Sequence, residues 1–300
     1  MLLKKSGGFE ARDPWVTRYR EYYYHCFTIG AARIYVTKSA TIAGLATEEP
    51  VLVWTPEEGK PYSKELWAPE LHIIDGKCYI YVACDDGDNY HHRMYVLAND
   101  SDDPTKPYRM GGKVSDPSDK WAIDATILSY EDKLYMIWSG WEGEENVCQN
   151  LYIAEMSDPY TIGTPRVLLS EPEYDWERVN CDGKNVPYIN EGACVYKQDG
   201  KLRILYSGSH SNWNTYCLGC LEFTGTNVME RAHWAKYPMP VLSQAEGWNG
   251  PGHCSVFSDG KTDYIAFHVF DEGKTEGWCN VHAEIHAFEL KDGKIVLSNI

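Results

Sequence analysis

Long apolar segments are missing from this chain of 300 residues. No run approaches the roughly 18 consecutive apolar residues that a membrane-spanning helix requires. The first residues, MLLKKSGGFEARDPWV, contain no apolar stretch of the kind found in secretory signal peptides. We therefore expect no membrane partner, and we predict a cytoplasmic protein.

Positive charge is also scarce. The chain has 28 Lys and Arg against 44 Asp and Glu, which gives a formal net charge of −16. Binding to nucleic acid needs a basic face that neutralises phosphates, and this composition argues against one. Nucleic acid is therefore not an expected partner.

A zinc-binding cysteine pattern is incomplete. Cys217 and Cys220 form a CxxC pair, but a zinc site built from such pairs needs a second one, and the sequence contains none. The chain has ten cysteines and no leader segment, so we expect reduced thiols, most of them small core residues. This expectation agrees with the predicted cytoplasmic location.

Sustained helical periodicity is rare, and no Pro-rich or Gly-rich linker divides the chain. Apolar segments of alternating or continuous type recur instead, separated by Asp-Gly turns at 75–76, 199–200, 259–260 and 292–293. The 22 Tyr and 11 Trp also favour strands. The sequence therefore predicts an all-β protein.

One unit recurs five times at intervals of about sixty residues. Each copy holds an alternating strand, a turn rich in Asp, Gly or Lys, and an aromatic-rich return strand, as in NEGACVYKQDGKLRILYSG at 190–208. Repeats of this length, each with about four strands, are typical of a β-propeller. We predict a single five-bladed β-propeller domain over residues 1–300. The alternative is an open β-sandwich with accidental internal similarity.

An ionisable residue stands near the start of the first strand in every unit: Asp13, Glu70, Asp124, Glu191 and His253. In a propeller the innermost strands converge on a central channel, so these side chains are predicted to meet at one mouth. Clustered carboxylates raise each other's pKa, and several on one ring suggest acid–base chemistry or a metal. The structural alternative is that they only cap strands or close turns.

A pair of carboxyl groups across a cleft is what glycoside hydrolysis requires, one as acid and the other as base or nucleophile. Flat indole faces near the same mouth suit sugar rings. Trp67, Trp141 and Trp15 lie close to the ring of ionisable residues in the sequence and are our candidate substrate contacts.

Five ordered motifs resemble glycoside hydrolase family 43, whose members are five-bladed propellers that cleave arabinose- and xylose-containing glycans. They are RDPWV at 12–16, WAPELH at 67–72, IDATIL at 123–128, NEGACV at 190–195 and GPGHCS at 250–255. The segments at 94–104, 151–162 and 168–177 resemble most the exo-acting α-L-arabinofuranosidases of that family. The resemblance covers nearly the whole chain.

The resemblance implies roles for individual residues. Asp13 would be the general base that activates water, Glu191 the general acid, and Asp124 the residue that orients Glu191 and raises its pKa. Because the family inverts anomeric configuration, base and acid are expected roughly 6.5–9.5 Å apart. His253 resembles a central histidine that often binds a channel ion through water, here calcium or sodium. Glu70 has no implied catalytic role.

The implied function is release of terminal α-L-arabinofuranose from arabino-oligosaccharides, with no cofactor required for the chemistry. The alternatives are a β-D-xylosidase, an endo-arabinanase, and a non-catalytic carbohydrate-binding propeller. One departure concerns sugar preference: in the stretch at 280–290, Glu284 stands where related arabinofuranosidases tend to carry Arg.

Overall fold

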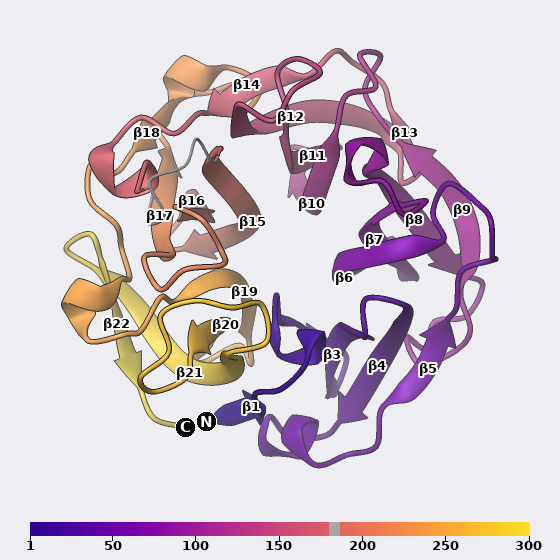
Figure 1. Ribbon diagram of the computed structural model, residues 1–300, viewed down its shortest axis with the longest axis horizontal. Coiled ribbons are helices and arrows are strands. Elements are labelled where there is room, and N and C mark those ends of the chain that lie inside the picture. Colours follow the sequence, from indigo (N-terminus) through magenta and orange to yellow (C-terminus); the bar gives the residue numbers. More distant parts are fainter. Residues whose placement is uncertain (180–186) are drawn as a thin grey trace.

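The computed structural model describes residues 1–179 and 187–300. In this part of the chain, antiparallel strands form five blades around a central axis, and the chain visits them in order (Figure 1). The fold is a five-bladed β-propeller, as the repeat predicts. Helical structure in the described residues is limited to short 3₁₀ turns: Phe9–Ala11, Ala43–Ala46, Asn89–His91, Asp175–Glu177, Arg231–His233 and Gln244–Glu246.

The first two blades are regular four-stranded antiparallel sheets. Blade 1 runs outward from the channel through β2 (Trp15–Tyr19), β3 (Tyr22–Ile29), β4 (Arg33–Ser39) and β5 (Val51–Trp54). Blade 2 repeats this order with β6 (Lys64–Ile74), β7 (Lys77–Asp85), β8 (Arg93–Asn99) and β9 (Arg109–Val114).

Blades 3 and 4 are joined by a short parallel pairing between two of their strands. Blade 3 contains β10 (Ala122–Tyr130), β11 (Lys133–Gly140), β12 (Cys148–Asp158), β13 (Thr161–Ile162) and β14 (Val167–Ser170). Blade 4 contains β15 (Tyr188–Gln198), β16 (Lys201–Gly208), β17 (Cys217–Phe223) and β18 (Trp234–Lys236). The link pairs Cys148 with Tyr188 and Gln149 with Ile189.

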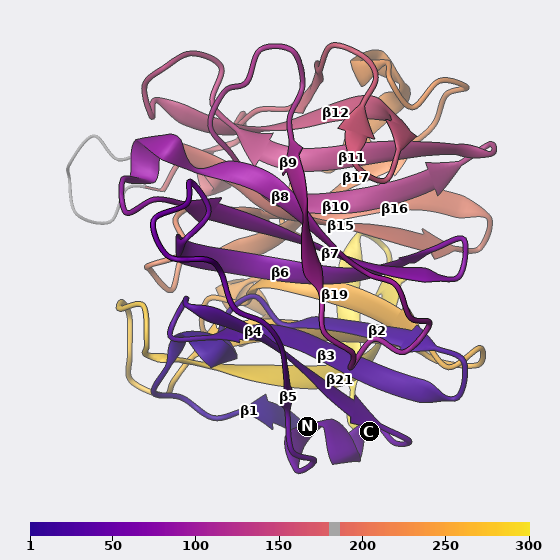
Figure 2. The ribbon, with the colours of Figure 1, turned by 90° about the vertical axis from the view of Figure 1, so that its right-hand side faces the viewer.

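Blade 5 uses both ends of the chain. Its strands are β19 (Gly252–Ser258), β20 (Asp263–Phe270), β21 (Val281–Lys291), β22 (Lys294–Ser298) and the N-terminal β1 (Leu2–Lys4), which pairs with β21. The terminal ammonium of Met1 also donates a 2.7 Å hydrogen bond to the Ile285 carbonyl. The two termini therefore lie side by side (Figures 1 and 2), and the first strand closes the ring against the last blade.

The apolar core is divided among the blade interfaces. Five large clusters of buried side chains each join two neighbouring blades, and the last joins blade 5 to blade 1 through residues such as Phe257 and Val16. Five interfaces for five blades is the pattern of a closed ring. Burial of both faces of each sheet explains why the strands read as nearly continuous apolar runs.

The inner strands share an unusual backbone feature. A residue with positive φ occurs near the channel end of each one: Asp13 (51°), Ala68 (42°), Asp124 (55°), Gly192 (58°) and His253 (46°). In blades 2 to 5 the strand pairing also shifts register at that point, as it does at a β-bulge. The left-handed region costs a non-glycine residue roughly 1–2 kcal/mol, and such strain is typical of functional sites.

This feature corrects the predicted equivalence of the five ionisable residues. Asp13, Asp124 and His253 occupy the equivalent left-handed position, but blade 2 places Ala68 there and blade 4 places Gly192. Glu70 and Glu191 were therefore aligned out of register. The extra residue of a bulge breaks the simple alternation of side chains, so an alignment based on alternation cannot locate it.

No helix among the described residues has the length and apolar character needed to cross a bilayer.

Candidate active site

A cavity of about 430 Å³ opens at one end of the channel. Asp13, Asp124, Glu191 and His253 all line it. Asp13 lies two residues before the start of β2, whereas the other three lie in the inner strands β10, β15 and β19. Four of the five predicted ionisable residues are thus brought together from four different blades.

Asp13 is surrounded by cationic and ring nitrogen groups. Its Oδ1 lies 3.1 Å from Nδ1 of His253 and 3.5 Å from Nδ1 of His268, and its backbone N–H donates to the same His268 atom. Burial alone would raise the pKa of Asp13, but His253 and Arg12 outweigh it and hold that pKa below its usual range. Asp13 is therefore an ionised carboxylate at neutral pH.

His253 carries the matching positive charge. Burial would lower its pKa, but the carboxylates of Asp13 and Asp124 outweigh this effect and raise it to about 9. Its backbone N–H donates to the Ser207 hydroxyl, which fixes the strand at this point. A protonated imidazole at the centre of the site therefore balances part of the clustered negative charge.

Asp124 connects two neighbouring blades. Its Oδ2 accepts a 3.1 Å hydrogen bond from the Gly192 amide, next to Glu191, and lies 4.0 Å from Nδ1 of His253. Burial raises the pKa of Asp124, with the charge of Asp13 adding to the effect and that of His253 opposing it. The carboxyl group of Asp124 is thus fixed beside the strand that carries Glu191.

Among the carboxyl groups of Asp13, Asp124 and Glu191, that of Glu191 is best placed to hold a proton. The Tyr216 hydroxyl donates a 2.8 Å hydrogen bond to its Oε1, and the Tyr216 ring stacks on His268. Burial and the neighbouring charge of Asp124 raise the pKa of Glu191. The site therefore holds two carboxyl groups in different protonation states. Asp13 stays ionised, and Glu191 retains its proton.

Three indole rings line the cavity: Trp67, Trp121 and Trp278. Trp67 stacks on His92 with ring centroids 3.9 Å apart, and His92 is itself buried against Asp85, Nδ1 to Oδ2 2.9 Å. The cavity therefore combines charged groups with flat apolar walls.

Two predicted substrate contacts lie elsewhere. Trp15 lines a separate cavity of about 370 Å³ together with His72, and its indole N–H donates to the Leu71 carbonyl. Trp141 is buried and stacks against Trp121, with centroids 4.7 Å apart. Proximity in sequence was a poor guide here: successive side chains on a strand such as β2 point to opposite faces, and Trp141 lies just beyond the end of β11.

Glu70 does not reach the cavity. It is buried, and its Oε2 lies 2.8 Å from Nε2 of His72. Burial raises the pKa of Glu70 well above its ordinary value. Its absence from the cavity lining agrees with the absence of an implied catalytic role.

His253 is poorly suited to bind a cation directly. Its Nδ1 is paired with Asp13, and its raised pKa favours the protonated ring, which has no free lone pair. Within residues 1–179 and 187–300, no group of three or more His, Cys, Asp or Glu is arranged to hold a metal ion. The residues present do not form a direct ligand set for the expected calcium or sodium ion.

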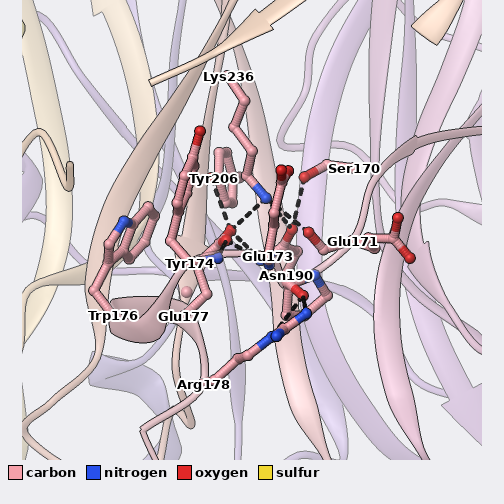
Figure 3. A network of polar contacts seen from close by, with 12 residues as sticks. Ser170, Glu171, Glu173, Tyr174, Trp176, Glu177, Arg178, Asn190, Tyr206 and Lys236 are labelled. Carbon is pink, nitrogen blue, oxygen red and sulfur yellow. Dashed lines mark hydrogen bonds and ion pairs between the residues drawn. The ribbon is translucent and has the colours of Figure 1, made fainter. Parts of the chain in front are cut away.

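A buried polar network supports the strand that carries Glu191 (Figure 3). Glu177 is fully buried, and its Oε1 accepts from Lys236 Nζ at 2.7 Å, Asn190 Nδ2 at 2.8 Å and Tyr206 OH at 2.9 Å. The Ser139 hydroxyl of blade 3 donates to the Asn190 carbonyl. Asn190, the residue before Glu191, is thus fixed from two sides.

Glu284 lies outside the cavity lining. Its carboxylate contacts His282 and His286 at 3.0 and 2.6 Å, and these two histidines hold the pKa of Glu284 below its usual range. Glu284, which stands where related arabinofuranosidases tend to carry Arg, therefore belongs to a cluster of charged side chains on β21 and not to the cavity wall.

Several residues that line the cavity were not predicted from the sequence, including Trp121 and Trp278. Trp121 lies two residues before the IDATIL motif, so its position in sequence offered a signal. Trp278 lies in a loop that only tertiary contacts bring to the cavity.

Together, the propeller and a cavity that holds carboxyl groups in different protonation states beside indole walls define a glycoside hydrolase. The family model for glycosyl hydrolases family 43 matches residues 8–295. The chain belongs to this family, whose members require no cofactor for catalysis.

Two curated relatives come from Streptomyces and are both named extracellular exo-α-(1→5)-L-arabinofuranosidase. The protein from Streptomyces chartreusis is 33% identical over 266 residues, which cover 86% of this chain and 79% of that protein. The protein from Streptomyces avermitilis is 33% identical over 265 residues, which cover 85% of this chain and 54% of that protein. This chain thus spans about half the length of the second relative.

A solved structure is similar over nearly its whole length. The α-L-arabinofuranosidase from Lactobacillus brevis superposes with a TM-score of 0.86 at 30% identity, covering 97% of this chain and 94% of that protein.

The prediction of a cytoplasmic location is wrong by this comparison, since both Streptomyces relatives are named extracellular. Burial explains why the cysteines do not indicate the location of the protein. Of the nine cysteines in the described part of the chain, all free, seven are buried. Thiols enclosed within the sheets are shielded from partners, so their reduced state does not report the redox compartment.

Proposed function

We propose that this protein is an inverting, exo-acting glycoside hydrolase that releases terminal α-L-arabinofuranose from arabino-oligosaccharides. The observation that carries the proposal is the opposite displacement of two pKa values in one cavity. The pKa of Asp13 is depressed mainly by His253 against the effect of burial, whereas that of Glu191 is raised by burial and Asp124. The names of the relatives support arabinofuranose as the sugar.

In this mechanism Asp13 accepts a proton from a water molecule as that water attacks the anomeric carbon. Glu191 donates its proton to the glycosidic oxygen as the bond to the leaving group breaks. Attack opposite to the leaving group inverts the configuration. Asp124 touches neither reacting atom in this scheme; it positions Glu191 through the Gly192 amide and raises its pKa.

The test is hydrolysis of an aryl α-L-arabinofuranoside, with the anomer of the released sugar followed by NMR. We expect inversion, and we expect Glu191→Gln to lower kcat by roughly 10²–10⁴-fold on substrates with a poor leaving group. The exposed Glu57→Gln is the matched control and is expected to retain full activity. An inactive wild-type protein, or a Glu191→Gln variant that stays fully active on arabino-oligosaccharides, whose leaving group is poor, contradicts the proposal.

The same assay separates the alternatives. An aryl β-D-xyloside cleaved in preference identifies a β-D-xylosidase, and internal cleavage of linear arabinan identifies an endo-arabinanase. Binding of arabino-oligosaccharide without turnover identifies a carbohydrate-binding propeller.

We also propose that residues 1–300 act as one catalytic domain. Closure of blade 5 by β1 supports this, because the N-terminal strand is part of the same ring as the catalytic strands. Cooperative thermal unfolding in a single transition is the expected result.

A calcium or sodium ion near His253, held only through water, remains a prediction. Calorimetric titration with each cation tests it. If neither calcium nor sodium binds, the prediction is wrong.

A further inference from the structure

Trp278 is exposed although it lines the catalytic cavity. Its exposed fraction is 47%, whereas Asp124 and Glu191 are 3% and 6% exposed. The terminal sugar must reach these buried carboxyl groups for its bond to break. Trp278 therefore lies toward the open end of the cavity, where the rest of a substrate would leave it.

The loop that carries Trp278, between β20 and β21, is held firmly. The side-chain amide of Asn249 donates to the carbonyls of Asp271 and Lys274 at 3.0 and 2.9 Å. The Gly277 amide donates to the Asn212 carbonyl at 3.1 Å. These bonds order the loop before any ligand binds, so the indole is presented at little further entropic cost.

Arg12 supports the indole from the protein side. Its guanidinium carbon lies 5.0 Å from the Trp278 ring centroid, and its Nη1 donates to the Trp278 carbonyl. Its Nη2 donates to the Ser211 carbonyl at 2.7 Å and lies 3.4 Å from Nε2 of His268. Arg12 is itself buried, 6% exposed. One buried cation thus links the exposed indole to the surroundings of Asp13.

We propose that Trp278 is the stacking platform for the sugar on the leaving-group side of the bond that is cleaved. Sugar rings present flat C–H faces that pack on indole, and an ordered, exposed ring at the open end of the cavity offers such a surface. The protein is then selective for arabinofuranosides whose leaving group is itself a sugar. This inference rests on the proposed function.

The experiment compares two substrates that share the terminal sugar and differ in the leaving group. Arabinofuranosyl fluoride has no leaving sugar, whereas α-1,5-arabinobiose has one. For Trp278→Ala we expect kcat/KM on arabinobiose to fall by about tenfold or more, with the value on the fluoride changed less than about twofold. Trp278→Phe keeps a flat ring and is expected to restore most of the activity on arabinobiose.

The matched control is Tyr22→Ala, an exposed aromatic on β3 that does not line the cavity, and neither substrate should be affected. Unchanged arabinobiose hydrolysis in Trp278→Ala, or an equal loss on both substrates, overturns the inference and leaves the proposed function intact. A wild-type protein that cleaves neither substrate overturns both. Melting temperatures of all variants separate loss of contact from loss of folding.

Discussion

His253 and Asp13 form an ion pair at the centre of the site, with Nδ1 of the imidazole 3.1 Å from Oδ1 of the carboxylate. Each group stabilises the charged form of the other, so the pKa of Asp13 falls while that of His253 rises to about 9.

His253→Asn removes the positive charge and keeps a residue that tolerates the positive φ of 46° at this position. The pKa values of Asp13, Asp124 and Glu191 should all rise, because His253 lowers each of them. Activity requires ionised Asp13 and protonated Glu191, so both limbs of the kcat/KM–pH profile should move to higher pH. The surface substitution His233→Asn is the control, and an acid limb that does not move contradicts the prediction.

Asp124→Asn should strongly shift only the alkaline limb of the kcat/KM–pH profile. This limb should move to lower pH. Removal of the negative charge beside Glu191 lowers the pKa of Glu191, so the proton needed for catalysis is lost at lower pH. The amide oxygen of Asn can still accept from the Gly192 N–H. The measurement is again the pH profile of kcat/KM, and an alkaline limb that stays in place would show that Asp124 does not tune Glu191.

Gly192→Ala should damage the site as well as the fold. The backbone at Gly192 has φ of 58°, and an added Cβ would lie 3.0–3.2 Å from the His253 ring. We expect a loss of about 1–2 kcal/mol of unfolding free energy, together with reduced activity because His253 must move. Gly200→Ala carries a similar backbone penalty, with φ of 72°, but its Cβ would meet nothing within 4 Å. It should lose stability without losing activity, and equal activity in the two variants would refute the role of the contact.

Glu177→Gln should be strongly destabilising, because it leaves the largely buried Lys236 ammonium without its counter-charge (Figure 3). Removal of one partner from a buried pair typically costs about 3–5 kcal/mol. The double variant Glu177→Gln with Lys236→Met should recover much of this loss. Chemical denaturation measures both, and a double variant no more stable than the single one would mean that the pair is not the main interaction.

The sequence was informative where the determinants are local. The recurring strand–turn–strand pattern predicts five blades, and the motifs around Asp13, Asp124, Glu191 and His253 identify residues that do line one cavity. The register of the inner strands was not predictable, because the bulges near Ala68 and Gly192 each interrupt the alternation of side chains on which the alignment depended. Trp278 was missed because only tertiary hydrogen bonds bring its loop to the cavity.

The left-handed residue of each inner strand has a consequence for how the chemistry can be altered. All five positions share a left-handed backbone, which is strained at every one except Gly192, so the ring presents five comparable backbone sites that differ in side chain. Ala68 is the one member that has a side chain but no polar group, and Asn adopts this conformation more easily than Ala does. Asn at position 68 would therefore relieve backbone strain at this point of the strand. The ring thus keeps one backbone conformation at this position while Asp, Ala, Gly and His occupy it.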